Sequence, residues 1–303
     1  MTILREPRAT LRERWMQRAR ETPLVLSNGL MVHGAATRLE RRFEHFIGDY
    51  FGPGGVETRR GMTVFDVGAN IGMFSLEVLR RCGGEACIFA FEPAPDTFSY
   101  LERNLRELFP YAPVVAACTA VADRPGMATF YHRPWASGTS SLQRKYPTAA
   151  DSLLEASLRE PPEEYRSQIP GWFQHLPRRV AKAILRQGFR LAGNDVVPIQ
   201  CAVTTVSDVL REHDIERIDY LKIDVEGAEL DVLRGIVPDD WARIARLGVE
   251  VHDVDGRLRT IRKMLAFAGF DDVDVEQGWP FEGTNVYMLH ARRTIPPAEE
   301  LRR

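Results

Sequence analysis

The sequence has few cysteines and no long apolar run. Only 4 of its 303 residues are cysteines, and their spacing matches no paired metal motif. Three of them lie in apolar stretches typical of buried structure, which fits a reducing cytosol. No window approaches the roughly 18 uncharged apolar residues of a membrane span, and the arginine-rich N-terminus lacks the apolar core of a signal peptide. We therefore expect a soluble, cytoplasmic protein.

The sequence also lacks an excess of either charge. It has 40 Lys and Arg residues against 42 Asp and Glu residues, for a net charge of -2. Without a strong global field, neither nucleic acid nor a membrane is expected as the main partner. The hydrophobic fraction of 44% is sufficient for one sizeable core at this length. The oligomeric state stays open, a homodimer included.

Strand and helix patterns alternate from Met62 onward, which predicts right-handed βαβ units and a parallel sheet. The last two strands are joined through a Gly/Pro-containing loop, so we expect the sheet to end in an antiparallel pair. The predicted strands are Thr63–Val67, Cys87–Phe91, Val114–Ala117, Pro198–Thr204, Tyr220–Val225, Leu247–Val251, Asp272–Glu276 and Asn285–Ala291. The predicted helices are Ile71–Arg81, Asp96–Leu108, Val206–His213, Ala228–Ile236 and Arg257–Phe267.

Two segments fall outside this alternation. Residues 1–61 are polar with amphipathic helical spacing, and we predict an N-terminal helical extension that covers a sheet edge or closes over a ligand. A proline-rich insertion at about 133–197 interrupts the main domain, 62–303. It contains a basic helix with an apolar stripe, which is either a solvated amphipathic helix or a substrate lid. The stripe consists of Leu176, Val180, Ile184 and Leu191.

The stretch FDVGANIG, which starts at Phe65, predicts a cofactor site. Gly68 and Gly72 allow a tight turn, and the amides of the next helix can hold an anionic group. The third glycine of a dinucleotide fingerprint is absent, and Asp66 before the turn suits an ammonium group better than a phosphate. Glu92 ends the next strand, where a carboxylate can accept hydrogen bonds from a ribose diol.

These features together suit S-adenosylmethionine, which has an amino acid end and a nucleoside end. Singly, each glycine could be a plain turn residue and Glu92 a solvated loop acid. The predicted cofactor-binding residues are Asp66, Val67, Gly68, Ala69, Asn70, Gly72, Glu92, Pro93, Ser141 and Asp224.

The motifs DVGANIG, FEPAPDTFSYLERNL, GTSSL, TTVSDVL, IDYLKIDVEGAELDVLRG and VEVHD resemble the motif series of the FkbM family of S-adenosylmethionine-dependent O-methyltransferases. The resemblance runs from about Met62 to Ala291. It implies a class I (Rossmann-like) methyltransferase fold, an α/β architecture whose seven-stranded, mostly parallel sheet has an antiparallel last strand. It also implies methyl transfer to a hydroxyl of a secondary metabolite or glycan. The stretch between GTSSL and TTVSDVL is longer than in the family pattern, which leaves the acceptor open.

Methyl transfer to an alcohol needs a base, and histidine is best poised for this near neutral pH. His252 lies just past a predicted central strand, beside Glu250, and the preceding strand brings Asp224 to the same rim. We predict His252, Asp224 and Glu250 as catalytic residues, with His252 as base; the alternative is that His252 only packs at the strand end. The same three could hold Mg²⁺, but we favour no metal. Lys222, inside an apolar strand, is expected to pair with an acid.

We predict an enzyme that methylates a hydroxyl of a polyketide-like secondary metabolite, either free or bound to a carrier. The alternative within the same chemistry is a sugar hydroxyl in a glycan or glycolipid. Two further alternatives belong to other classes, an NAD-dependent dehydrogenase and a non-catalytic nucleoside-binding scaffold. The missing third glycine argues against the first, and the presence of Asp66, Glu92 and Asp224 argues against the second.

Overall fold

The structure is a computed structural model. It describes residues 21–26, 28–34, 47–134, 136–144, 158–159, 173, 175–193, 196–278 and 281–293, apart from the side chains of 188–193. The predicted helical patterns of 1–20 and 35–46, and the side chain of Leu191, lie outside the described residues. In the part of the chain that is described, no helix is long and apolar enough to cross a membrane.

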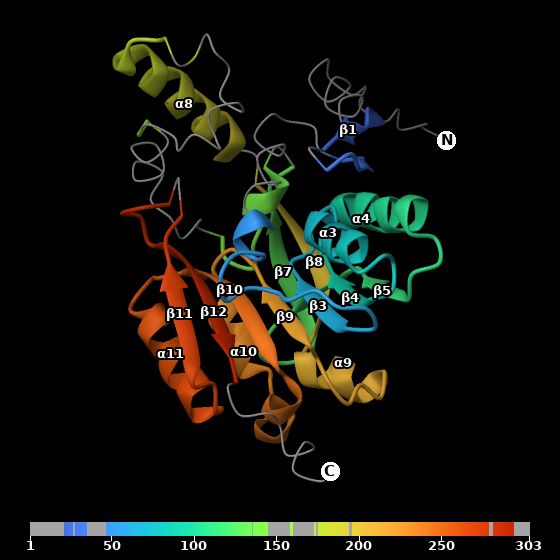
Figure 1. The fold of residues 1–303 in the computed structure, drawn as a ribbon. Coiled ribbons are helices and arrows are strands. Elements are labelled where there is room, and N and C mark those ends of the chain that lie inside the picture. The colour runs from blue at the N-terminus through green and yellow to red at the C-terminus, as the bar shows by residue number, and fades with distance from the viewer. Residues whose placement is uncertain are drawn as a thin grey trace, which may run out of the picture.

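A seven-stranded sheet forms the centre of the molecule, with the order β11-β12-β10-β9-β3-β4-β5 (Figure 1). Its strands are β3 (Thr63–Val67), β4 (Cys87–Phe91), β5 (Val114–Ala117), β9 (Tyr220–Ile223), β10 (Arg246–His252), β11 (Asp272–Glu276) and β12 (Val286–Arg292). Only β12 runs antiparallel to its neighbours, β10 and β11. The predicted sheet and its antiparallel last strand are confirmed.

Helices cover both faces of this sheet because alternate strand residues point to opposite sides. One face packs through Val64 and Met288 against α3 (Met73–Arg81) and α4 (Pro95–Leu108). The other packs through Phe65 and Leu221 against helices that follow in the C-terminal half. These are α9 (Val206–Glu212), α10 (Glu229–Arg234) and α11 (Arg257–Phe267), and a 3₁₀ turn, η3 (Pro238–Arg243), precedes β10.

A second, three-stranded sheet is the main departure from the predicted fold. It has the order β6-β8-β7 and consists of β6 (Thr119–Val121), β7 (Gly126–His132) and β8 (Val197–Thr204). The strand predicted at Pro198–Thr204 is therefore present, but it pairs with β6 and β7 and not with the main sheet. Only Cys118 separates β5 from β6, so in the sequence the two strands look like one.

The N-terminal extension and the insertion contain further elements. A hairpin of β1 (Leu24–Val25) and β2 (Met31–Val32) lies within the extension that we predicted to be helical. Its turn contains Asn28 and Gly29, a pair that favours hairpins. In the insertion, η2 (Ser137–Thr139) precedes the predicted basic helix, α8 (Arg178–Gly193). Figure 1 shows α8 beyond the carboxyl ends of the parallel strands.

Candidate active site

The candidate site lies at the carboxyl ends of β3, β4, β9 and β10. From β3 the chain passes outward to β4 and β5, and it later returns on the other side of β3 as β9. This reversal makes the edge between β3 and β9 a topological switch point, where open α/β sheets bind ligands. The predicted glycine turn follows β3, and the predicted acids follow β4 and β9.

The turn after β3 brings its backbone against the end of β9. Gly68 has a φ of 79°, and a Cβ on it would lie 1.8 Å from the carbonyl oxygen of Asp224. The amides of Gly68 and Ala69 donate to the carbonyl oxygen of Phe91, at 3.1 and 2.9 Å. Gly72 caps α3 with a φ of 92°. Only a glycine fits at position 68, so this residue is required by packing as well as by the turn.

Glu92 is buried, with 7% of its surface exposed, and is not the solvated loop acid of the alternative interpretation. The amides of Asn70 and Ala94 donate to its two carboxylate oxygens, at 3.1 and 3.0 Å. Burial raises the pKa of Glu92 to about 7, although both amides and Lys222 lower it. A carboxylate can accept about four hydrogen bonds, so acceptor positions remain for a ligand. Pro93, next in the chain, is buried as well.

Asp66 and Lys222 form a buried pair beneath the turn. The Lys222 ammonium lies 3.1 Å from Asp66 and 3.4 Å from Asp224, and it donates to the Gly68 carbonyl oxygen at 2.7 Å. Ser75 donates to the other oxygen of Asp66 at 2.6 Å. The expected pairing of Lys222 with an acid is thus confirmed. Asp66 has no exposed surface, so it does not face the site as expected but fixes Lys222.

Asp224 is the acid that reaches the rim, since 29% of its side chain is exposed. Its amide donates to the carbonyl oxygen of Val67 at 3.0 Å, which ties the end of β9 to β3. The side chain of Val67 is buried in the core, so only its backbone belongs to the site. Val67, like Gly68 and Gly72, can therefore offer a ligand only its backbone groups.

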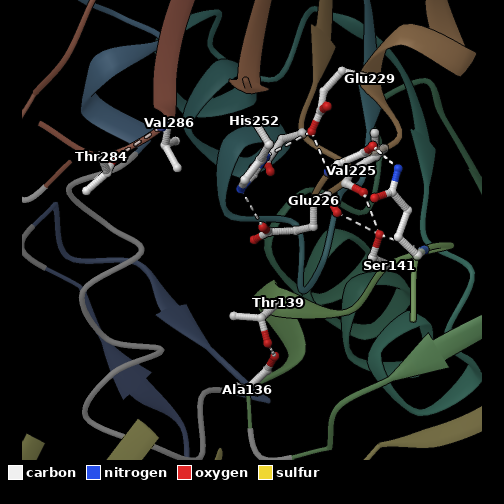
Figure 2. A network of polar contacts seen from close by, with 12 residues as sticks. Ala136, Thr139, Ser141, Val225, Glu226, Glu229, His252, Thr284 and Val286 are labelled. Carbon is white, nitrogen blue, oxygen red and sulfur yellow. Dashed lines mark hydrogen bonds and ion pairs between the residues drawn. The ribbon is translucent and has the colours of Figure 1, made fainter. Parts of the chain in front are cut away.

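His252 is the last residue of β10, not a residue beyond the strand, and its side chain is completely buried. Its Nδ1 lies 3.0 Å from Glu229 and its Nε2 lies 3.1 Å from Glu226 (Figure 2). Burial lowers the pKa of His252, but the hydrogen bonds and charges of the two glutamates outweigh it and raise the pKa well above its usual range. Each ring nitrogen therefore has a carboxylate partner, an arrangement that favours the doubly protonated imidazolium.

Sequence reasoning missed Glu229 and Arg257, which fix the position of His252. Glu229 lies at Nδ1 of His252, and Arg257 lies at its carbonyl oxygen. Glu229 is fully buried and accepts a hydrogen bond from the amide of Gly227 at 2.5 Å. Arg257 donates to Glu229 at 3.1 Å and to the carbonyl oxygen of His252 at 3.0 Å. The spacing VEGAE contains a signal, because a tight turn after β9 brings Glu226 and Glu229 to the same side. Arg257 lies on another helix and leaves no such signal.

Glu226 has a left-handed backbone, with a φ of 54°, and its side chain is 11% exposed. In Figure 2 its carboxylate points away from its own turn, between His252 and the η2 turn that contains Thr139. Burial raises the pKa of Glu226, and the charges of Asp224 and Glu229 add to this while His252 lowers it. A strained conformation at a non-glycine residue often marks a functional position.

The first turn of the insertion is fastened to this region. Ser141 is fully buried and donates to the carbonyl oxygen of Glu226 at 2.6 Å, and Gln143 donates to that of Gly227 at 2.5 Å. The buried guanidinium of Arg133 donates to the carbonyl oxygens of Thr139 and Arg144. Ser141, which was predicted to contact the cofactor, thus holds the β9–α10 loop in place through its hydroxyl.

Glu226, Glu250 and His252 could together hold a metal ion, since one ligand atom from each lies within 4.8 Å of the others. The predicted set had Asp224 in the place of Glu226. Burial raises the pKa of Glu250 well above its usual value, as do the charges of Asp224 and Glu226. However, a cation would have to displace the proton that His252 holds between two carboxylates.

The sheet order, the glycine turn and the buried strand-end acid define a class I, Rossmann-like methyltransferase. Residues 66–271 match the methyltransferase FkbM domain, and the chain belongs to this family.

Two curated relatives and one solved structure illustrate the similarity. The 31-O-demethyl-FK506 methyltransferase FkbM of Streptomyces tacrolimicus is 35% identical over 79% of this chain and 84% of its own. Methyltransferase 1 of Beauveria bassiana is 33% identical over 76% of this chain and 80% of its own. The precorrin-6y C5,15-methyltransferase of Geobacter metallireducens aligns over 89% of this chain and 93% of its own, at 13% identity and a TM-score of 0.39.

Proposed function

We propose that this protein is an S-adenosylmethionine-dependent O-methyltransferase that methylates a hydroxyl of a secondary metabolite. One observation carries the proposal: the Glu92 carboxylate is held by the amides of Asn70 and Ala94 beside the Gly68 turn, at the switch point of the sheet. A buried acid with free acceptor positions at this place suits a ribose diol. The Streptomyces relative is named as a methyltransferase of 31-O-demethyl-FK506, which supports a secondary metabolite as the acceptor.

In this proposal the donor lies across the ends of β3, β4 and β9. Glu92 binds the ribose, and the amides at the start of α3 lie near the carboxylate of the amino acid end. Asp224, half-buried at the rim, attracts the cationic part of the donor. S-adenosylmethionine supplies the electrophilic methyl group, and the protein has to align the acceptor oxygen with it at roughly 3 to 3.5 Å.

The proton of the acceptor hydroxyl passes to Glu226, which His252 positions. Prediction assigned this role to His252 alone, but an imidazole with both nitrogens paired to carboxylates already carries its second proton. Glu226 has exposed surface and can receive the proton, while His252 holds the carboxylate in position. Glu229 and Arg257 fix His252 in turn.

The test uses isotopically labelled S-adenosylmethionine with three sets of acceptors: hydroxylated polyketides, the same compounds loaded on a carrier protein, and glycans. We expect labelled O-methyl products, seen by mass spectrometry, from the polyketide sets. Labelling of the glycans alone would move the acceptor to a sugar hydroxyl. If calorimetry shows no binding of S-adenosylmethionine or S-adenosylhomocysteine, the proposed function is wrong.

A further inference from the structure

Tyr50 is a buried aromatic residue that the site described so far does not use. It lies in the chain segment before β3, and 2% of its surface is exposed. Its ring packs edge-on against Phe74 of α3, at 5.4 Å between centroids, and the ammonium of Lys222 lies 5.8 Å from the ring centre. Tyr50 therefore lies beside the same lysine that pairs with both Asp66 and Asp224.

The position of Tyr50 is closely determined by its surroundings. Its carbonyl oxygen accepts a hydrogen bond from the amide of Val56 at 2.7 Å. Gly248, in the middle of β10, leaves the space for the ring, because a Cβ there would lie 3.0 Å from Tyr50 Cδ1 and 2.1 Å from the hydroxyl of Tyr220. A glycine inside a strand usually marks such a close approach. The ring is thus held rigidly over the strand.

The hydroxyl of Tyr50 has no hydrogen-bond partner among the described residues. A buried hydroxyl without a partner is costly, since it has lost water and gained nothing in exchange. Other buried polar atoms of the site have ionic partners: Asp66 Oδ1 lies 3.1 Å from the Lys222 ammonium, and Glu226 Oε2 lies 3.1 Å from His252 Nε2. An unsatisfied group at a closely packed position indicates that a ligand completes the site.

Two acidic residues, Asp224 and Glu250, lie on the face of the sheet that the Tyr50 ring covers. Side chains two residues apart on a strand share one face, so Glu250 follows Gly248 toward the carboxyl edge and Asp224 follows Lys222. Burial raises the pKa of Tyr50 well above 10, and Asp224 and Glu250 add to this more than Tyr220 and Asp66 do. Tyr50 therefore stays a neutral phenol, which can accept and donate a hydrogen bond at once.

We propose that Tyr50 is a donor-binding residue whose hydroxyl oxygen, together with the carboxylates of Asp224 and Glu250, receives the ammonium of the methyl donor's amino acid end. The inference rests on the proposed function. An ammonium has three protons to give, and two acids and a phenol oxygen are three acceptors. Asp66, the acid that sequence reasoning chose for this ammonium, is sealed beneath Lys222. The segment before β3 thus contributes directly to the cofactor site.

The substitution Tyr50→Phe tests this assignment because it removes only the hydroxyl and keeps the ring. We expect the ligand-free variant to melt at the same temperature as the parent or higher, since an unsatisfied group has been removed. Affinity for S-adenosylhomocysteine should fall about tenfold or more, because its ammonium loses an acceptor. Affinity for 5′-methylthioadenosine, which has the nucleoside but no ammonium, should not change. Calorimetry measures both ligands.

Tyr220→Phe is the matched control. The Tyr220 hydroxyl lies 3.5 Å from Nδ1 of His290, on the same face but at the start of β9. This variant should melt at a lower temperature and bind both nucleosides as the parent does. Glu250→Gln should repeat the selective loss of S-adenosylhomocysteine affinity.

Three results would overturn the assignment of Tyr50. These are an unchanged affinity of Tyr50→Phe for S-adenosylhomocysteine, an equal loss for methylthioadenosine, and a lower melting temperature of the ligand-free variant. In each of these cases the parent still binds S-adenosylhomocysteine, so the proposed function stands. A parent protein that binds neither nucleoside would overturn both.

Discussion

At the scale of single residues, Glu92 couples donor binding to pH. Burial raises the pKa of Glu92 to about 7, so in the ligand-free protein the carboxyl is largely protonated below that pH. A ribose diol donates two hydrogen bonds and prefers the carboxylate. We predict that the affinity for S-adenosylhomocysteine rises by up to about tenfold per pH unit below pH 7 and levels off above it. Calorimetry between pH 5.5 and 8.5 measures this.

Two variants control for other titrating groups. Glu92→Gln should bind more weakly and lose the pH dependence, whereas Asp96→Asn, an exposed acid at the start of α4, should behave like the parent. If Glu92→Gln kept the same pH dependence as the parent, another group would be responsible.

The Glu226–His252 pair predicts a separation of catalysis from binding. Because neither residue is placed against the donor's nucleoside, His252→Ala and Glu226→Gln should each lower turnover by about two orders of magnitude and leave S-adenosylhomocysteine affinity within a few-fold. Single-turnover kinetics with labelled donor and calorimetry measure the two quantities. Turnover within a few-fold of the parent in both variants would remove the pair from the mechanism.

The group Glu226, Glu250 and His252 leads to a prediction about metals. His252 is held as an imidazolium by two carboxylates, at 3.0 and 3.1 Å, so we expect chelators to leave turnover and donor affinity unchanged. The assay is run with and without EDTA, and then with added Mg²⁺. A loss of turnover with EDTA that Mg²⁺ restores would contradict the prediction and assign a cation to this group.

At the scale of elements, the contact between the turn after β3 and the end of β9 depends on the absence of a side chain at Gly68. A Cβ at position 68 would lie 1.8 Å from the carbonyl oxygen of Asp224, so Gly68→Ala must push the two strand ends apart. We predict loss of S-adenosylhomocysteine binding and a melting temperature lower by several degrees.

Gly61→Ala is the matched control for backbone strain. Gly61 also has a positive φ, of 72°, but nothing lies within 4 Å of its Cβ position. This variant should lose about 1 to 2 kcal/mol of stability through its backbone alone and keep donor affinity. If the two variants bound S-adenosylhomocysteine equally, the close approach at Gly68 would not matter for the site.

Three neighbouring strands of the main sheet could be predicted to the residue because they are short, apolar and bounded by turns, whereas the bounds of β9 and β10 differ from the prediction by one or two residues. The bounds of β3, β4 and β5 agree with the prediction. The second sheet could not be predicted in this way, because β7 pairs with a strand far along the chain. Thr129, at the centre of β7, lies opposite Gln200 of β8, 71 positions later. Pairing between distant strands leaves little trace in local patterns.

The site residues also divide into those that the sequence predicts and those that it does not. Gly68, Glu92 and Asp224 stand directly after buried strands, so their place at the carboxyl edge followed from the chain order. The roles of Asp66 and His252 did not, because burial depends on what packs above a side chain. Tyr50 and Arg257 escaped prediction altogether, since they reach the site from segments that carry no motif.

At the scale of the whole molecule, buried acids make stability depend on pH in an unusual direction. Burial raises the pKa of Asp49 from 3.8 to about 6 and that of Glu92 from 4.5 to about 7. Over these intervals the folded protein binds more protons than the unfolded chain, so the free energy of unfolding falls as the pH rises. The raised pKa of His252 acts in the same direction above pH 6.5. The lowered pKa of Glu77, about 2, has the opposite effect below pH 4.5.

We therefore predict a melting temperature that is highest near pH 4, where the opposite effects of Glu77 and the buried acids balance, and that declines toward pH 8. Differential scanning fluorimetry over this range measures it. Glu92→Gln should flatten the decline between pH 4.5 and 7. S-adenosylhomocysteine should raise the melting temperature more at pH 8 than at pH 5, because it binds the ionised Glu92. A maximum at pH 7 or above would contradict the assignment of these acids.

The reversed direction of β12 has a practical consequence for handling the enzyme. β12 runs back against β10, and Arg293 at its end donates to the carbonyl oxygens of Trp241 and Ile244, before the start of β10. The described chain therefore leaves the sheet at the edge opposite to Glu92 and Glu226. A solid support or a fusion partner attached downstream of Arg293 would start from the side of the sheet opposite the candidate site and would leave that site accessible.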